Sequence, residues 1–316
     1  MNQTSRVVLF REVFCSWQDA LEAFVLFKKA EGYSSRTIKD YRYHVALLFR
    51  ECPQAWSPQD ANKTRMAVLS YLNGQDGIAP ATFNIRRKYL KAFFSWLVDE
   101  GTYTRNPLEG IRTRKAEPRI VQHSAEVLTK LLKLPDKTTY CGKRDYALLC
   151  LSIDTAIRPS EALALELDDV NLKEMAVLIR ASIAKTRKSR TLPFSVETAK
   201  ALQALIASRP REWETPLLFA NYEGDKLTVS GWRQRLKKVY APKLGLKRLS
   251  PYDLRHDAAL HFLRNGMNPF ALQTIMGHTT LDMTKRYIAL AESDIREAHE
   301  TASPIKKFIG NKKRVR

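Results

Sequence analysis

Residues 149–161 read LCLSIDTAIRPSE, an apolar stretch that is interrupted by a charged segment. The run from Leu149 to Ile153 is apolar enough for a buried helix. Pro159 biases Arg158 toward extended backbone and can itself begin the next helix. Arg158 therefore falls at a break between two buried helices, and Glu161, about one turn further on, can orient its guanidinium. An ordinary core needs neither charge, so this stretch marks a candidate site.

The sequence on either side of this stretch also has the periodicity of helices. Apolar residues recur at helical spacing over 124–134 and 144–153, and helices resume from Val196. Between them the helical period gives way to the alternation of a β-strand, with apolar residues at every second position: Val177, Ile179, Ala181 and Ile183. Residues 186–189 have the composition of a turn, and 190–194 are predicted to be extended again. We therefore expect a mainly α-helical fold with a β-hairpin or small antiparallel β-sheet.

Residues 14–100 predict a separate helical domain. Residues 34–37, Ser-Ser-Arg-Thr, supply helix caps before apolar positions 38, 41, 45 and 48, and Pro80 begins a helix that Gly101 ends. On that helix Arg87, Lys88 and Lys91 share one side, from which cations can contact phosphates. An ordinary solvated helix face explains these three residues equally well.

A basic linker is expected next, over residues 101–119. This segment contains Asn-Pro, Gly and Glu-Pro, which are typical of loops, together with Arg112, Arg114 and Lys115. We expect these three cations to lie along DNA. The predicted organisation is an N-terminal extension over 1–13, a helical domain over 14–105, the linker over 106–119, a second domain with a C-terminal helix over 120–305, and a basic tail over 306–316.

The positive charge is distributed along the whole chain. The 53 Lys and Arg against 33 Asp and Glu give a formal charge of +20 over 316 residues. Residues 1–118 carry +6, residues 119–305 carry +8 and residues 306–316 carry +6. This distribution favours a long polyanion, nucleic acid before an anionic membrane surface, as the partner. General basicity for solubility is the alternative.

The sequence also excludes or disfavours several classes of protein. No apolar run approaches the roughly 18 residues of a membrane span, and residues 1–14 do not resemble a secretion signal. Cys15, Cys52, Cys141 and Cys150 are spaced for neither a zinc site nor a disulfide framework, which favours a reducing cytoplasm. Phosphate-binding glycine motifs of nucleotide and dinucleotide sites do not occur, so no cofactor and no metal are expected.

Three more segments hold polar residues that a core would not require. Lys185 begins the basic stretch Lys-Thr-Arg-Lys-Ser-Arg, at the end of the first predicted strand. Tyr252 and Arg255 are spaced to share one face of a helix that begins after Pro251. His278 follows Met-Gly, and Tyr287 comes nine residues later. Each alone has an ordinary structural explanation, as an ion pair, a core histidine or a packing aromatic.

In order and spacing, these segments together resemble the tyrosine recombinases, or phage integrase family. The resemblance rests on TAIRPSE (155–161), the lysine of AKTRKSRTLP (184–193), YDLRH (252–256), MGHTT (276–280) and the tyrosine that follows. It extends over nearly the whole chain, since residues 14–110 look like the family's helical core-binding domain. It implies a helical DNA-binding domain followed by the family's catalytic domain.

The resemblance also implies roles for named residues. Arg158 and Arg255 would hold the scissile phosphate, which arginine pairs with bidentately. Tyr287 would be the nucleophile that forms a 3′-phosphotyrosyl bond, and Lys185 would protonate the leaving 5′-oxygen. His278 would help to accept the tyrosine proton or bind the phosphate, and Glu161 would support the arginines. Three further cations of the hairpin are expected to contact DNA: Arg187, Lys188 and Arg190.

Two departures from the family pattern stand out. Tyr252 occupies the usual position of a histidine, and a phenol donates hydrogen bonds well but is a poor proton shuttle near neutral pH. We expect less dependence on this residue, not an inactive enzyme. Ala156-Ile157 replaces the common Gly-Leu, which we attribute to packing. His256 matches the second histidine of the box and is expected to be structural.

The expected partners are double-stranded DNA recombination sites and further copies of the chain. By resemblance, two copies bind each site and a tetramer forms through the C-terminal helix, although a helix packed on its own domain is equally expected from the sequence. The absence of room for an arm-binding domain favours compact Xer-like or mobile-element recombinases, working in the cytoplasm on the nucleoid. A non-cleaving DNA-binding protein and a type IB topoisomerase-like enzyme stay open as alternatives.

Overall fold

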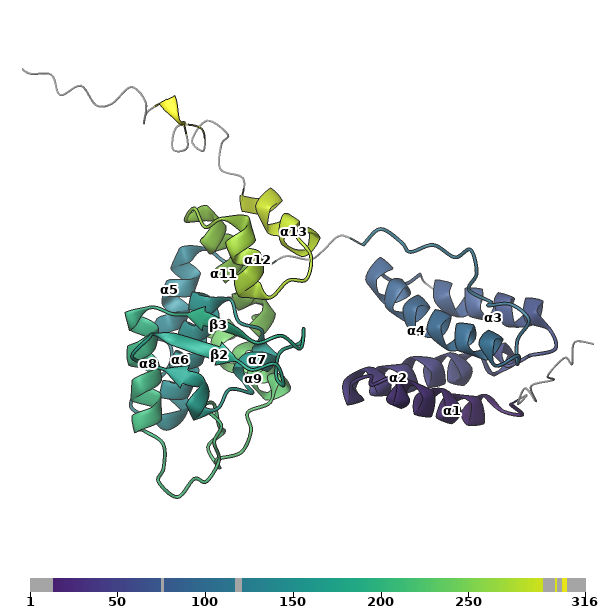
Figure 1. The fold of residues 1–316 in the computed structure, drawn as a ribbon, viewed down its shortest axis with the longest axis horizontal. Coiled ribbons are helices and arrows are strands. Elements are labelled where there is room, and N and C mark those ends of the chain that lie inside the picture. The colour runs from purple at the N-terminus through teal and green to yellow at the C-terminus, as the bar shows by residue number, and fades with distance from the viewer. Residues whose placement is uncertain (1–13, 75–76, 117–120, 292–298, 300–302, 306–316) are drawn as a thin grey trace, which may run out of the picture. The chain divides into compact units, whose positions relative to one another are not determined.

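The computed structural model describes residues 14–74, 77–116, 121–291, 299 and 303–305. Contacts divide the chain into two compact units, Met1–Pro118 and Arg119–Arg316, which are described separately (Figure 1). The predicted N-terminal extension over 1–13 and basic tail over 306–316 lie outside the described residues. In the described part, no helix combines the length and apolar character needed to cross a membrane.

In its described residues, unit 1 is a bundle of four α-helices. They are α1 (Trp17–Ala30), α2 (Ser35–Glu51), α3 (Ala61–Asn73) and α4 (Pro80–Asp99), with a short 3-10 turn, η1 (Pro53–Ala55). The predicted starts of α2 and α4 are confirmed, because the Ser34 side chain caps α2 and Pro80 is the first residue of α4. Phe24 and Phe93 meet edge to face in the core, with ring centroids 5.3 Å apart.

Residues 107–114, predicted within an exposed linker, are attached to unit 1. Asn84 of α4 donates to the carbonyl of Arg114 at 2.8 Å and accepts from its amide at 2.9 Å. Arg65 of α3 donates to the carbonyls of Pro107 and Glu109 at 2.8 and 2.9 Å. These bonds satisfy backbone groups that an exposed linker would leave to water. The segment is therefore part of the first unit as far as Arg114.

Unit 2 is mainly helical. Its described helices are α5 (Ala125–Lys133), α6 (Tyr140–Thr155), α7 (Pro159–Ala162), α8 (Val196–Ala207), α9 (Val229–Arg235), α10 (Ala241–Lys243), α11 (Pro251–Arg264), α12 (Pro269–Met276) and α13 (Asp282–Ala291). There is also a short 3-10 turn, η2 (Leu167–Asp169), and a π-helical segment, η3 (Leu236–Tyr240). The long helix α11 packs against α6, α12 and α13. The helices predicted over 124–134, 144–153 and from Val196 are thereby confirmed.

The sheet of unit 2 has three antiparallel strands in the order β1 (Val170–Asn171), β2 (Ala176–Ile179) and β3 (Arg190–Pro193). Val177 faces Leu192 across β2 and β3, and both are buried. The predicted class, mainly helical with a small antiparallel sheet, is correct.

The first predicted strand is too long, however. Pairing ends at Ile179, because the Arg180 carbonyl accepts the amides of Ile183 and Ala184 at 3.1 and 3.0 Å, which folds the chain into turns. Ala181 is consequently exposed, although its place in the alternation predicted an inward position. Lys185 therefore lies in the connection between β2 and β3 and not at a strand end.

The ends of three helices position the candidate site. α6 ends at Ala156, whose φ of 49° is left-handed, and α12 ends at Gly277, whose φ is 61°. Left-handed backbone is ordinary for glycine and unfavourable for alanine. α11 begins with a capping box in which Ser250 and Asp253 satisfy one another's amides. The left-handed backbone at Ala156 gives a conformational reason for the glycine that is common there in the family pattern, beyond the packing that we expected.

Candidate active site

One cavity of about 420 Å³ in unit 2 gathers most of the predicted site residues. We call it the arginine cavity. Its lining comprises Arg158, Ser160, Lys185, Thr186, Tyr252, Arg255, His256, Gly277, His278, Thr279, Met283 and Tyr287. Six of the seven residues predicted to be catalytic belong to this set, although they come from α7, the β2–β3 connection, α11, α13 and the residues that follow α12. The seventh, Glu161, lies behind Arg158.

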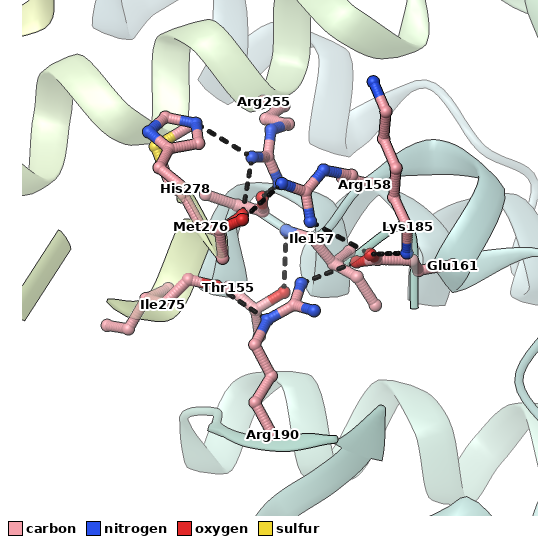
Figure 2. A network of polar contacts seen from close by, with 12 residues as sticks. Thr155, Ile157, Arg158, Glu161, Lys185, Arg190, Arg255, Ile275, Met276 and His278 are labelled. Atoms are coloured by element: carbon pink, nitrogen blue, oxygen red, sulfur yellow. Dashed lines mark hydrogen bonds and ion pairs between the residues drawn. The ribbon is translucent and has the colours of Figure 1, made fainter. Parts of the chain in front are cut away.

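Arg158 is held from two sides at the start of α7. Its Nη1 donates to Glu161 Oε1 at 3.0 Å, and its Nη2 donates to the Gly277 carbonyl at 2.6 Å (Figure 2). The side chain is nearly buried. A guanidinium with partners on both sides is fixed in orientation, so it can meet an anion without first being ordered.

Arg255 is the more deeply buried of the two cavity arginines, at 4% exposure. Its Nη1 donates to the Ala156 carbonyl at 2.5 Å, and its Nη2 donates to the Met276 carbonyl at 2.9 Å and lies 3.3 Å from His278 Nε2 (Figure 2). Burial, together with the charge of Arg158, lowers the pKa of Arg255 to about 10. These three contacts are to uncharged acceptors, so an anion in the cavity would relieve the cost of burying this charge.

Glu161 is completely buried and supplies the negative charge behind the arginines. Its Oε1 accepts from Arg158 and from the Lys185 amide, the latter at 3.3 Å, and its Oε2 accepts from Arg190 at 2.5 Å. Burial acts to raise the pKa of Glu161, but the hydrogen bond from Arg190 and the charges of Arg190 and Arg158 outweigh it and hold the pKa below its ordinary value. The carboxylate is therefore ionised at neutral pH.

Arg190 was expected to contact DNA, but the structure turns its guanidinium inward. Besides Glu161, it donates from Nε to the Ile275 carbonyl at 3.1 Å, and its side chain is only 11% exposed (Figure 2). Its strand position explains the difference, because β3 carries the side chain under α12. Arg190 therefore joins Glu161 to the end of α12, and it does not reach outward for a phosphate backbone.

Lys185 and the other hairpin cations stay at the surface. The Lys185 amide is fixed on Glu161 while its side chain lines the arginine cavity, and Figure 2 shows the side chain extended away from that carboxylate. Arg187 and Lys188 are exposed further along the same connection. The chain thus anchors Lys185 through its backbone and leaves its ammonium group within reach of a ligand.

Tyr287 lies on α13 with its ring buried, at 2% exposure, among Ala156, Ala258 and Met276. Its hydroxyl is 2.5 Å from His256 Nδ1. The ring is nearly parallel to that of His278, at 12° and with centroids 6.3 Å apart. Sequence reasoning expected His256 to be structural, because no local pattern reveals that α13 packs against α11 at this residue.

Tyr252 stands at the wall between the arginine cavity and a second cavity of about 460 Å³. The second cavity, which we call the basic cavity, is lined by Arg233, Lys237, Arg248, Leu249, Ser250, Tyr252, Asp253 and His256. Tyr252 is 46% exposed, so its phenol is available to a ligand. Sequence reasoning missed the three cations of this cavity, which lack a recognisable spacing.

The cations predicted to bind DNA from unit 1 divide into two groups. Arg87 donates to the Ile111 carbonyl at 2.6 Å, and Arg114 donates to Asn73 Oδ1 at 2.8 Å with its guanidinium over the Phe83 ring. These two guanidinium groups are therefore engaged in contacts within unit 1. The other four predicted cations of unit 1 are exposed: Lys88, Lys91, Arg112 and Lys115.

The described residues contain no group of three or more His, Cys, Asp or Glu side chains that could hold a metal ion. The arginine cavity has cationic and aromatic lining instead, with Glu161 engaged by arginines. Its chemistry suits an anionic group of roughly phosphate size.

Comparisons with known proteins agree with this geometry. Residues 123–294, more than half of the chain, match the phage integrase family. The tyrosine recombinase XerC of Herpetosiphon aurantiacus is 31% identical over 284 residues, covering 85% of this chain and 90% of that protein. XerC of Roseiflexus castenholzii is 33% identical over 236 residues, covering 72% and 73%. The chain therefore belongs to the phage integrase family: it is a tyrosine recombinase, an enzyme of site-specific DNA recombination.

Solved structures share the fold at lower identity. The Tn1549 transposon integrase in complex with transposon right end DNA has a TM-score of 0.68 at 20% identity, covering 90% of this chain and 99% of that one. The XerH site-specific recombinase bound to palindromic difH substrate has a TM-score of 0.67 at 21% identity, covering 92% and 85%. Both the expected family and the expected fold are confirmed.

Proposed function

We propose that the arginine cavity cuts and rejoins one DNA strand, with Tyr287 as the nucleophile. The observation that carries this proposal is that Arg158, Arg255 and Tyr287 line the same cavity although they lie on three different helical segments. The phenolic oxygen attacks phosphorus, a 3′-phosphotyrosyl bond forms and a 5′-hydroxyl leaves. A second strand's 5′-hydroxyl reverses the step, and the bond energy is kept in the ester, so ATP is not required.

The arginines supply the electrostatic part of this reaction. Charge builds on the non-bridging phosphate oxygens in the transition state, and fixed donors stabilise it because they need no reorganisation. Arg255 is buried with only uncharged acceptors in its described contacts, which makes it a strong attractor for that charge. Glu161 and the Gly277 carbonyl hold Arg158 in place, and Arg190 in turn binds Glu161. His278 contacts the guanidinium group of Arg255.

Lys185 supplies the proton for the leaving 5′-oxygen in this proposal. Its side chain is exposed and lines the arginine cavity, which fits a residue that reaches the bound DNA. Tyr252 donates a hydrogen bond to a phosphate oxygen, as a phenol does readily without changing its own protonation. The cations of the basic cavity, which shares the wall at Tyr252, continue the positive surface along the DNA backbone.

The assembly and setting are proposed from the resemblance to the family. The protein binds double-stranded recombination sites, two copies to a site, and four copies assemble through the C-terminal helix. Most residues after Ala291 lie outside the described part, so this assembly rests on the family relationship. Two relatives above 30% identity are XerC enzymes, which favours Xer-like recombination at the nucleoid over a mobile element.

A suicide substrate tests the proposal. A duplex site selected from random sequence is nicked close to the cleavage point, so that the released fragment diffuses away and the covalent adduct accumulates. We expect the wild type to form an adduct that is visible by denaturing electrophoresis, and Tyr287→Phe to bind the same duplex without forming one. Tyr222→Phe, an exposed phenol on a distant loop, is the matched control and keeps full activity.

The alternatives give different results. A bound duplex that never yields an adduct with the wild type would indicate a DNA-binding protein on this fold. Relaxation of any supercoiled plasmid, with no preference for the selected site, would indicate a topoisomerase-like enzyme. The comparisons favour neither of these.

A further inference from the structure

The Nδ1 atom of His256 lies within hydrogen-bond distance of the Tyr287 hydroxyl oxygen, at 2.5 Å. The two residues come from α11 and α13, which pack together, and the ring centroids lie 5.6 Å apart. His256 also lines the arginine cavity, so this contact sits where the proposed reaction occurs.

The nucleophile must lose a proton to act. An ordinary phenol has a pKa of about 10, so only about one molecule in a thousand is ionised at pH 7. A base within hydrogen-bond reach therefore accelerates the attack, and an imidazole with an ordinary pKa of about 6.5 is suited to that task. Three other side chains of the cavity are candidates for this base: His278, Tyr252 and Lys185.

The contacts of His278 argue against it. Arginine can only donate, so His278 Nε2, 3.3 Å from Arg255 Nη2, must be the acceptor. The proton of a neutral His278 then lies on Nδ1, which donates to Thr284 Oγ1 at 2.9 Å. The lone pair of His278 is therefore used by Arg255. Tyr252 is itself a phenol, and a lysine ammonium group donates hydrogen bonds but cannot accept one.

We propose that His256 is the catalytic base for Tyr287, in place of the histidine that Tyr252 replaces. This inference rests on the proposed function. The Tyr287 hydroxyl proton moves to Nδ1 of a neutral His256 whose own proton is on Nε2. As the new O–P bond forms, the P–O5′ bond breaks and the leaving oxygen takes a proton from Lys185. In religation the 5′-hydroxyl gives its proton back to Lys185 as it attacks phosphorus, and the departing Tyr287 oxygen takes its proton back from His256.

Several charged and titratable groups face His256 and set its behaviour. On its own helix these are Tyr252, Asp253 and Arg255, and from α13 Tyr287. The remaining groups lining the two cavities that His256 shares are Arg158, Lys185, His278, Arg233, Lys237 and Arg248. Most of the charged members of this set are cations.

His256→Asn separates proton transfer from positioning. The asparagine amide occupies nearly the place of Nδ1 and can still hydrogen-bond the phenol, but it cannot accept a proton. We expect single-turnover adduct formation with bound suicide substrate to fall about 100-fold at pH 7.5. The wild-type rate should rise from pH 5.5 to a plateau, whereas the variant rate should continue to rise with pH as the phenol ionises by itself. His261→Asn on the same helix is the matched control.

A rescue experiment keeps the test decisive. A fluorinated tyrosine at position 287, which is more acidic than tyrosine, should restore the His256→Asn rate substantially and change the wild-type rate little. Retention of the wild-type rate and pH profile in His256→Asn overturns the proposal, as does a slow variant that the fluorinated tyrosine fails to rescue. Wild-type adduct formation in the same assay distinguishes either result from failure of the proposed function, and thermal unfolding confirms that the variant is folded.

Discussion

Replacing Gly277 by alanine should impair cleavage because the added methyl group meets the guanidinium groups of Arg158 and Arg190. An ideal Cβ at this position would lie 3.0 Å from Arg158 Nη1 and 3.2 Å from Arg190 Cζ. The Gly277 carbonyl also accepts from Arg158 at 2.6 Å, so the backbone cannot shift without disturbing that bond. The guanidinium of Arg158 must move by a few tenths of an ångström.

The size of the effect follows from two separate costs. Left-handed backbone costs alanine about 1–2 kcal/mol, which lowers stability. A displacement of about 1 Å in a positioning group costs about 100-fold in rate, so a few tenths of an ångström should cost about tenfold. We expect the free energy of unfolding to fall by about 1–2 kcal/mol and adduct formation to slow about tenfold.

The assay is single-turnover adduct formation on the suicide substrate at saturating protein, paired with urea unfolding. Gly266→Ala is the matched control: Gly266 also follows the end of a helix, its φ is 87°, and an added Cβ would meet nothing within 4 Å. It should lose similar stability and keep the wild-type cleavage rate. Equal cleavage rates for the two variants would refute the argument that Gly277 provides space for Arg158.

Two further changes test the charges around the site. Glu161→Gln leaves Arg158 and Arg190 without their shared carboxylate and should destabilise the fold by about 3–5 kcal/mol in urea unfolding at pH 7. Because the pKa of Glu161 is lowered in the folded protein, this difference should shrink as the pH falls below about 4.5, and a constant difference down to pH 3 would contradict the ionised carboxylate. His123 is buried against Asp257 at 2.7 Å, and that hydrogen bond raises its pKa. The stability lost in His123→Ala should therefore be greatest below pH 6.5 and decrease as the pH rises through the folded-state pKa, whereas a pH-independent loss would show that only packing is involved.

Local signals predicted the helices well because their causes lie within a few residues. Ser34 and Ser250 cap helices, and Pro80 and Pro251 begin them, and these are short-range effects that a sequence displays directly. The predicted alternation past Ile179 failed for a reason outside that range. Arg180 binds Glu166 and Asp169 at 2.8 Å, and its carbonyl starts a turn, so long-range ion pairing overrides a local β pattern.

The candidate site was predicted through family resemblance more than through local chemistry. Motif order identified Arg158, Arg255 and Tyr287, which the structure places around one cavity. It could not show which cations face inward, since Arg190 lies in the same basic stretch as the exposed Arg187. Nor could it reveal the contact between His256 and Tyr287, which depends on how α13 packs on α11.

The two arginines that line the cavity, Arg158 and Arg255, donate most of their described hydrogen bonds to main-chain carbonyl oxygens at the C-terminal ends of helices. Ala156 and Gly277 are the C-caps of α6 and α12, and Met276 is the last residue of α12. Three peptide carbonyls at the partly negative ends of helices therefore accept hydrogen bonds from the two guanidinium groups. Every residue type has a main-chain carbonyl oxygen. A substitution at Ala156, Met276 or Gly277 can therefore shift the position of the acceptor but cannot remove it. Carbonyl oxygens carry only partial negative charge, so they do not neutralise the two guanidinium groups. The cavity therefore keeps a positive charge that a DNA phosphate can neutralise.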